Sequence, residues 1–221
     1  MPNVQSYDDM TIEIIHATPY PAEMVGLAQS ITMKVSGSEM IPPMTKKKIK
    51  FLIDAEHHSL LEHVSYTFLI QGISRSLLAQ ITRQRTAKPT SGSQHYQNYS
   101  DYPCSVHDPG NTIIKTSLEA SYAAYKELLD SGVPKEEARQ VLPNATCVNY
   151  LWTIDARNLM YFLKQRLCNR NVLEMRVLAH KVEKLVVVHF PELFGQVGPQ
   201  CEMDICKQGF LQCEAKICQR V

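Results

Sequence analysis

The stretch Gln80–Tyr96, QITRQRTAKPTSGSQHY, joins an apolar helical pattern to a polar segment, and the rest of the chain is organised around it. The apolar residues at helical spacing are Ile73, Leu77, Leu78 and Ile81. This spacing predicts a helix with a buried aliphatic face. The polar residues that we expect at its C-terminal end are Gln80, Arg83 and Gln84. Pro89 and Gly92 then prevent the helix from continuing, so we expect a loop.

The two arginines in this stretch, Arg83 and Arg85, are followed by polar residues without any acidic one. These polar residues are Thr86, Lys88, Thr90, Ser91, Ser93, Gln94 and His95. Guanidinium groups make bidentate contacts with phosphate, and loop hydroxyls and amides supply further donors. The pattern therefore indicates an anion site. The alternative is that both arginines only stabilise a helix C-terminus and face solvent.

Bulk properties describe an ordinary globular protein. The chain has 221 residues, enough for one domain with a sizeable core, with 44% hydrophobic residues, 20% charged residues and a net charge of +1. This balance gives no reason to expect a nucleic-acid or membrane partner. We find no signal-peptide pattern and no apolar run of about 18 residues, and we expect a cytoplasmic protein. We predict a domain over residues 1–199 and a cysteine-rich tail over 200–221.

Periodicity predicts a mixture of strands and helices. We expect strands at residues 11–17, 64–70 and 145–154. We expect helices at residues 21–31, 46–55, 113–129, 134–143, 156–168 and 172–188, and we expect the tyrosines of the helix at 113–129 to lie in the core. Asp155 is the expected N-cap of the helix that follows it.

A polar block, Glu56–His63, contains three histidines and two glutamates. Imidazole and carboxylate bind zinc or iron, so a metal-dependent hydrolase built on His57, His58 and His63 is one hypothesis. The His-Glu-x-x-His order of a helical zinc site is absent. We therefore expect His58 and His63 to be structural.

Several ordered motifs resemble those of the flavin-dependent thymidylate synthases. Arg-Gln-Arg at 83–85, seven further residues and then Ser93 is similar to the family signature of Arg-His-Arg, seven residues and Ser. The other similar blocks are His57–Phe68, Glu136–Arg139 with Leu142–Pro143, Trp152–Arg157, Phe162–Arg166 and Glu174–Arg176. The resemblance spans Thr11–Pro199 and is more specific than any single motif.

This resemblance implies an α+β fold with a central antiparallel sheet packed with helices, and a homotetramer with sites between subunits. It also implies transfer of a one-carbon unit from methylenetetrahydrofolate to C5 of dUMP, with NADPH-reduced FAD supplying hydride. The catalytic residues implied are His57, Arg85 and Arg166. The FAD-binding residues implied are His57, Ser59, Arg83, Gln84 and Arg85. The nucleotide-binding residues implied are Gln80, Arg85, Ser91, Ser93, His95, Arg139 and Arg166.

The sequence departs from the family pattern where nucleotide and flavin would meet. Gln84 replaces a histidine, His95 replaces an arginine, Ser91 stands where glutamate is common, and Tyr161 stands where Asn or His is more usual. Asn171–Val172 replaces Ala-Gln. These changes lead to two alternatives: a divergent enzyme that methylates UMP, whose 2′-hydroxyl needs space and a partner, or a flavin- or nucleotide-binding protein without catalysis.

The last two predicted helices carry four arginines, and a buried arginine needs an anionic partner. They are Arg157, Arg166, Arg170 and Arg176. We expect a phosphate at Arg166, whereas Arg157 and Arg176 are also placed to hold the helices together through Glu174.

Seven cysteines in a cytoplasmic chain argue against a disulfide framework. The four nearest the C-terminus are Cys201, Cys206, Cys213 and Cys218. A structural zinc site is one hypothesis for them, although their spacing is at the edge of the usual pattern, and free thiols are the alternative.

Overall fold

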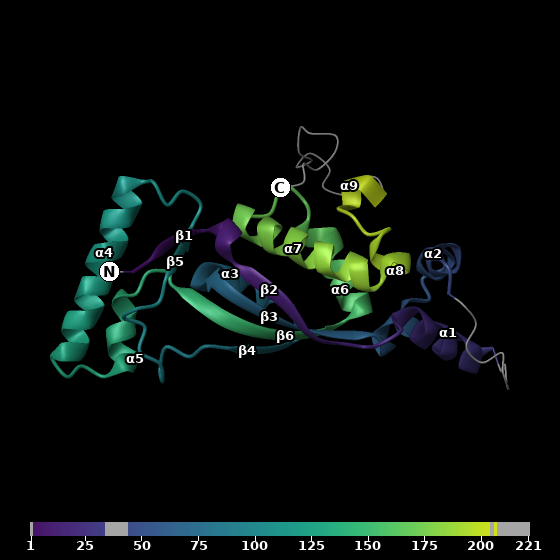
Figure 1. The fold of residues 1–221 in the computed structure, drawn as a ribbon, viewed down its shortest axis with the longest axis horizontal. Helices are drawn as coiled ribbons and strands as arrows, with labels where there is room; N and C mark the ends of the chain where they lie inside the picture. Colours follow the sequence, from purple (N-terminus) through teal and green to yellow (C-terminus); the bar gives the residue numbers. More distant parts are fainter. Residues whose placement is uncertain (1, 34–43, 204–205, 207–221) are drawn as a thin grey trace. The chain divides into compact units, whose positions relative to one another are not determined.

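The computed structural model describes residues 2–33, 44–203 and 206, which group into two compact units (Figure 1). Unit 1 contains the described residues of 1–13, 69–85 and 89–152. Unit 2 contains those of 14–68, 86–88 and 153–221.

The strands form one four-stranded sheet and one two-stranded sheet. They are β1 (Val4–Ser6), β2 (Thr11–Ala17), β3 (Ser65–Ser74), β4 (Lys88–Ser91), β5 (Cys104–Val106) and β6 (Cys147–Asp155). The larger sheet has the order β2-β3-β6-β4, and β1 pairs in parallel with β5. The hydroxyls of Thr67 and Thr153 lie 2.9 Å apart, and the amide of Ala156 donates to the carbonyl of Val64. These contacts join the start of β3 to the end of β6, so the two strands are antiparallel as predicted.

The helices agree closely with the sequence periodicity. They are α1 (Pro21–Thr32), α2 (Lys46–Asp54), α3 (Arg75–Ile81), α4 (Thr112–Asp130), α5 (Lys135–Ala138), α6 (Ala156–Arg166), α7 (Leu173–His189), α8 (Pro191–Phe194) and α9 (Gln200–Met203). Short 3-10 helices are η1 (Tyr7–Asp9), η3 (His58–His63) and η4 (Arg139–Val141). Within the described ranges, none of these helices has the length and apolar character needed to cross a membrane.

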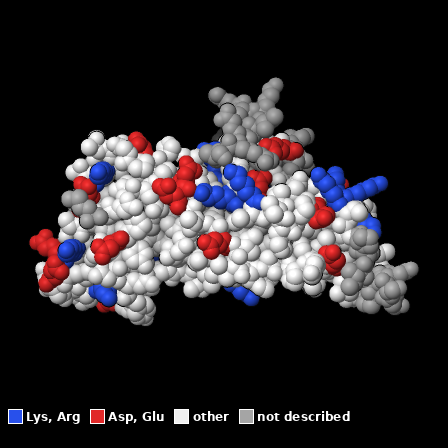
Figure 2. All heavy atoms as spheres, viewed as in Figure 1, with Lys and Arg blue, Asp and Glu red and all other residues white. Residues whose placement is uncertain are grey.

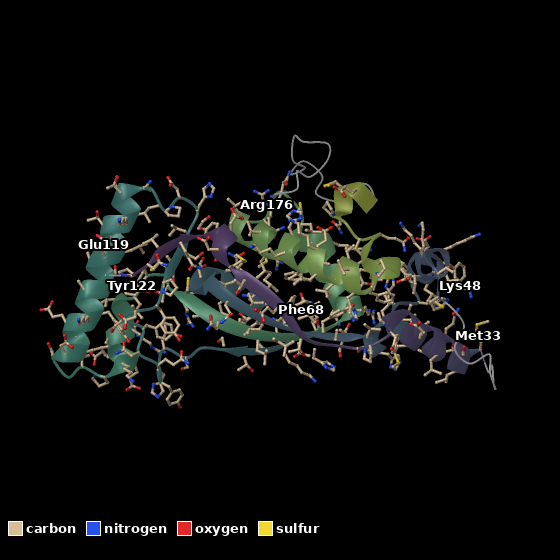
Figure 3. All side chains as sticks on the ribbon, in the orientation of Figure 1. Met33, Lys48, Phe68, Glu119, Tyr122 and Arg176 are labelled. Atoms are coloured by element: carbon tan, nitrogen blue, oxygen red, sulfur yellow. The ribbon has the colours of Figure 1, made fainter. Side chains whose placement is uncertain are left out.

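One hydrophobic cluster of unit 1 forms where α4 packs against β5. Leu118 and Tyr122 of α4 are buried with Cys104 and Val106 of β5, which confirms that the helix turns its tyrosine face inward (Figure 3). The hydroxyl of Tyr122 donates to Oγ1 of Thr146 at 3.2 Å, so its polar end is satisfied. Burial raises the pKa of the Tyr122 phenol well above its ordinary value.

Unit 2 is built on the packing of α6 against α7. Asp155 caps α6 as predicted, because its carboxylate accepts from the amide of Asn158 at 2.9 Å. The helix ends at Arg166 and not at Cys168, because the side-chain amide of Asn171 donates to the carbonyls of Gln165 and Cys168. On the face seen in Figure 2, acidic and basic side chains are interspersed, and basic ones gather over α2 and α7.

Two local predictions around the central stretch are wrong. β3 extends to Ser74, so Ile73 lies in a strand; α3 begins only at Arg75, where Ser74 Oγ accepts from the amide of Leu77 at 2.9 Å. The expected loop after Arg85 contains β4. Pro89 is tolerated there because β4 is an edge strand of the larger sheet.

Candidate functional site

The Ser93–Gln97 segment of unit 1 is a hydrogen-bonded turn. The carbonyl of Ser93 accepts from the amides of Tyr96 and Gln97 at 3.2 and 3.0 Å. The hydroxyl of Ser93 accepts from the amide of His95 at 3.3 Å. In that bond the Ser93 oxygen is the acceptor and uses one lone pair. The proton of the Ser93 hydroxyl therefore remains available for donation to an anion.

Gly92 fixes the entry to this turn. Its amide donates to the carbonyl of Asn149 in β6 at 3.1 Å. A Cβ at this position would lie 2.8 Å from the hydroxyl of Tyr99, whose ring is fully buried. The close approach of a rigid side chain therefore requires glycine before Ser93.

His95 makes a side-chain contact with Glu136 that the sequence did not predict. Its Nδ1 lies 3.0 Å from Oε2 of Glu136 in α5. The carbonyl of Glu136 accepts from Nε of Arg139 at 3.1 Å, and Lys135 Nζ donates to the carbonyl of Tyr96 at 3.1 Å. The structure thus brings together two predicted nucleotide-binding residues, His95 and Arg139, through Glu136.

The remaining predicted residues of unit 1 lie on α3, beyond it, or on β4. Gln80 is half-buried on the last turn of α3, and Arg83 and Gln84 follow the end of that helix. Arg83 and Arg85 are exposed, and neither guanidinium forms an ion pair or hydrogen bond with a residue that the structure describes. Ser91 is exposed on β4. Two cations thus remain available to a ligand.

In unit 2, the 3-10 helix η3 presents two of the predicted flavin-binding residues. His57, immediately before η3, and Ser59 within it are both exposed. His58 is structural, as expected: its Nε2 lies 3.1 Å from the carbonyl of Ile53, and its Nδ1 lies 2.5 Å from the hydroxyl of Tyr161. Because a carbonyl only accepts, Nε2 donates and Nδ1 accepts from Tyr161.

Arg166, the other predicted catalytic residue, is partly satisfied within unit 2. Its Nη1 donates to Oδ1 of Asn171 at 3.1 Å. Its Nε is buried and has no hydrogen-bond partner among the described residues, and burial lowers the pKa of the guanidinium. A buried donor without a partner is unfavourable, which is consistent with an external anion as the missing acceptor.

The other arginines of this helix pair have different partners. Arg157 forms an ion pair with Glu62, and the hydrogen bond to that carboxylate raises the pKa of the guanidinium. Nη1 of Arg176 donates to Oδ1 of Asn169 at 3.3 Å, and Figure 3 shows Arg176 on α7. These partners differ from Glu174, the partner expected from the sequence for both arginines.

Unit 2 also contains a cavity of about 610 Å³. His58 and Tyr161 line it, together with the charged residues Lys50, Asp54, Glu56, Lys164 and Glu202. Lys50 is already paired with Asp54 at 2.8 Å. The lining is therefore of mixed charge and does not select for an anion.

The metal hypotheses receive no support from the described residues. Among these, no group of three or more His, Cys, Asp or Glu side chains is arranged to hold a metal ion. Cys201 and Cys206 have no disulfide partner among the described residues, and Cys213 and Cys218 lie outside this part of the chain. The zinc site of the tail stays an untested prediction.

Comparisons with known proteins agree with the fold and the motifs. A family model described as "Thymidylate synthase complementing protein" matches residues 8–192. A flavin-dependent thymidylate synthase from Geobacter sulfurreducens is 33% identical over 217 residues, covering 92% of this chain and 94% of the relative. Another, from Sulfurisphaera tokodaii, is 36% identical over 204 residues, covering 87% of this chain and 79% of the relative.

A solved structure supports the fold. The crystal structure of a UMP/dUMP methylase from Streptomyces cacaoi, bound with 5-Br dUMP, matches with a TM-score of 0.72 and 23% identity. The match covers 87% of this chain and 95% of the other. With the family model matching most of its length, this chain belongs to the family of the flavin-dependent thymidylate synthases.

Proposed function

We propose that this chain catalyses the flavin-dependent C5-methylation of a uridine 5′-monophosphate. Methylenetetrahydrofolate is the proposed carbon donor, and FAD reduced by NADPH is the proposed cofactor. The observation that carries this proposal is the family match over residues 8–192, together with relatives named flavin-dependent thymidylate synthases over about nine-tenths of the chain.

The cationic residues of the chain are suited to the nucleotide. Arg85 is exposed and without an ion-pair partner among the described residues, and Ser93 retains a hydroxyl proton to donate. Arg139 uses Nε internally, which leaves its terminal nitrogens for a ligand. Arg166 has a buried Nε that lacks an acceptor within the described chain. Their proposed role is to bind the phosphate and, for Arg85, to stabilise negative charge on the uracil ring so that C5 becomes nucleophilic.

The residues present also fit a flavin. His57 and Ser59 are exposed, and the Arg83 guanidinium is exposed without an ion pair among the described residues. An imidazole, a hydroxyl and a guanidinium are suitable donors for the ring and diphosphate of FAD, with Gln84 and Arg85 as further proposed contacts. When bound and reduced, FAD supplies the hydride that completes the methyl group. His57 is proposed to position the pyrimidine beside that ring.

We extend the proposal to a homotetramer in which several chains build each site. Residues of the two units therefore need not act within the same chain. We also propose that the protein is cytoplasmic, as the sequence leads us to expect.

A second candidate substrate is favoured by residue 91. Ser91 is exposed on β4 and stands where the family resemblance leads us to expect glutamate. A hydroxymethyl group in place of a longer carboxylate leaves volume near the nucleotide, which suits UMP with its additional 2′-hydroxyl.

The visible absorption spectrum and a turnover assay test the proposal. Purified protein should show the bands of bound oxidised flavin, and should convert UMP or dUMP to its 5-methyl product with methylenetetrahydrofolate and NADPH. A yellow, reducible protein that gives no product with UMP, dUMP or dCMP would favour a binding protein without catalysis. A colourless protein that a chelator inactivates would favour the metal-dependent hydrolase.

A further inference from the structure

The contact between His95 and Glu136 determines which hydrogen-bonding group residue 95 presents. Nδ1 of His95 lies 3.0 Å from Oε2 of Glu136, and the imidazole is 44% exposed. Nε2 makes no hydrogen bond with any residue that the structure describes. One ring nitrogen is therefore held internally, and the other is open to a ligand.

The chemistry of the carboxylate fixes the tautomer. An ionised carboxylate only accepts hydrogen bonds, so Nδ1 of His95 must carry the proton. In the neutral imidazole, Nε2 is then an acceptor. An arginine at this position would present only donors. With histidine in place of arginine, and with Nδ1 bonded to Glu136, residue 95 therefore offers a ligand a hydrogen-bond acceptor where an arginine would offer donors.

Helix α5 holds this arrangement at more than one point. Lys135 Nζ donates to the carbonyl of Tyr96, and Nε of Arg139 donates to the carbonyl of Glu136. The imidazole also packs edge-on against the ring of Tyr96, with centroids 4.4 Å apart. These contacts restrict the rotation of the His95 side chain, so Glu136 orients the ring as well as fixing its tautomer.

An acceptor at Nε2 needs a donor on the nucleotide. A uridine monophosphate with an ionised phosphate offers the N3–H of uracil, the 3′-hydroxyl and, in the ribonucleotide alone, the 2′-hydroxyl. The first two are common to UMP and dUMP. Ser91 precedes His95 on the same segment and has a short side chain, which leaves space for the additional hydroxyl.

We propose that His95, oriented by Glu136, accepts a hydrogen bond from the 2′-hydroxyl of UMP and so gives the enzyme a preference for the ribonucleotide. This inference rests on the proposed function, because it places a uridine monophosphate beside His95. His95 touches the substrate, and Glu136 is a positioning residue that acts through it.

The test compares the dissociation constants and the KM values of UMP and dUMP at mildly alkaline pH. Wild type should bind UMP about 3- to 10-fold more tightly than dUMP, as expected for one hydrogen bond to a neutral hydroxyl. His95→Arg should abolish this preference, because arginine has no acceptor. Glu136→Ala should reduce it about 2- to 3-fold by raising the KM for UMP, since the imidazole then adopts either tautomer, with kcat nearly unchanged.

Glu137→Ala is the matched control. Glu137 is exposed on the same short helix, and its carboxylate makes no hydrogen bond or ion pair with the described residues. This variant removes the same charge and should keep the wild-type preference. Two outcomes would overturn the inference. One is that His95→Arg and Glu136→Ala keep the wild-type ratio of the dissociation constants of UMP and dUMP. The other is that these variants weaken the binding of UMP and dUMP equally.

The binding measurement separates the two levels of the proposal. If the protein methylates the nucleotide but the variants keep the wild-type preference for UMP over dUMP, only the role of His95 and Glu136 is refuted. The expected preference in binding without any methylation refutes the proposed activity alone. Absence of binding by either nucleotide refutes both.

Discussion

Replacement of Arg166 by methionine separates a role in ligand binding from a role in folding. In the free protein the guanidinium has a buried Nε without a partner among the described residues and one hydrogen bond, from Nη1 to Asn171. Removing an unsatisfied buried donor stabilises the fold by about 1–3 kcal/mol. The lost hydrogen bond has a charged donor and costs about 1.5–3 kcal/mol, and the lost cation in the last turn of α6 costs about 0.3–1 kcal/mol.

These terms nearly cancel, so Arg166→Met should change the free energy of unfolding by less than about 2 kcal/mol. Its effect on the nucleotide should be much larger. A charge-assisted hydrogen bond contributes about 1.5–3 kcal/mol, and a bidentate contact with phosphate contains two. Loss of about 3 kcal/mol weakens binding by more than about 100-fold.

Arg176→Met is the matched control. Arg176 also has a buried Nε without a partner among the described residues and one side-chain hydrogen bond, to Asn169, but no role in nucleotide binding is expected for it. Urea denaturation of the free protein gives the stability, and isothermal titration with UMP and dUMP gives the affinity. Equal loss of affinity in both variants, or wild-type affinity in Arg166→Met, would refute a phosphate contact at Arg166.

Three further predictions follow from single contacts. Gly92→Ala should weaken UMP binding at least about 10-fold, because a Cβ 2.8 Å from the hydroxyl of the buried Tyr99 forces the turn to move. Tyr161→Phe should lower the free energy of unfolding in urea by about 1 kcal/mol, because Nδ1 of His58 loses its donor. Stability should fall as pH rises from 10 to 12, because burial raises the pKa of Tyr150 to about 12 and the unfolded chain ionises first.

Each of the three has a clear opposite outcome. Gly110→Ala should leave UMP binding intact, because a Cβ there would meet only the side-chain Oδ1 of Asp108, at 3.2 Å. A loss equal to that of Gly92→Ala would show that the Tyr99 contact is irrelevant. For Tyr161→Phe, an unchanged urea midpoint would show that the hydroxyl contributes nothing. For Tyr150, a free energy of unfolding that stays constant across the alkaline range would contradict its burial as a neutral phenol.

The sequence predicted regular elements well and their ends less well. The strand predicted at residues 145–154 is present as β6, in which Val148, Tyr150 and Trp152 are buried and alternate with the exposed Asn149 and Leu151. Ile73 was misassigned because one apolar residue fits both a strand and a helical repeat. The end of α6 was missed because it depends on a side chain beyond the helix, that of Asn171.

Prediction of the candidate site is limited in a similar way. The sequence gives the chemistry of each side chain, but it does not show which other residue of the fold that side chain contacts. The sequence groups Glu136 with Arg139 in one motif, but the Glu136 carboxylate contacts His95, which is distant in sequence. No local pattern contains that contact, because it depends on how α5 packs beside the turn after Ser93.

The arginines show why this information is needed to assign a function. Arg157 has its charge paired with Glu62, whereas Arg83 and Arg85 have no ion pair among the described residues, although all three belong to motifs of the same family resemblance. A cation paired within the fold has less to gain from a ligand, because binding an anion must compete with the existing carboxylate. Charge left unpaired is available for phosphate at little cost. The pairing pattern therefore supports the proposed anion site at Arg83 and Arg85, and it is consistent with a structural role for Arg157.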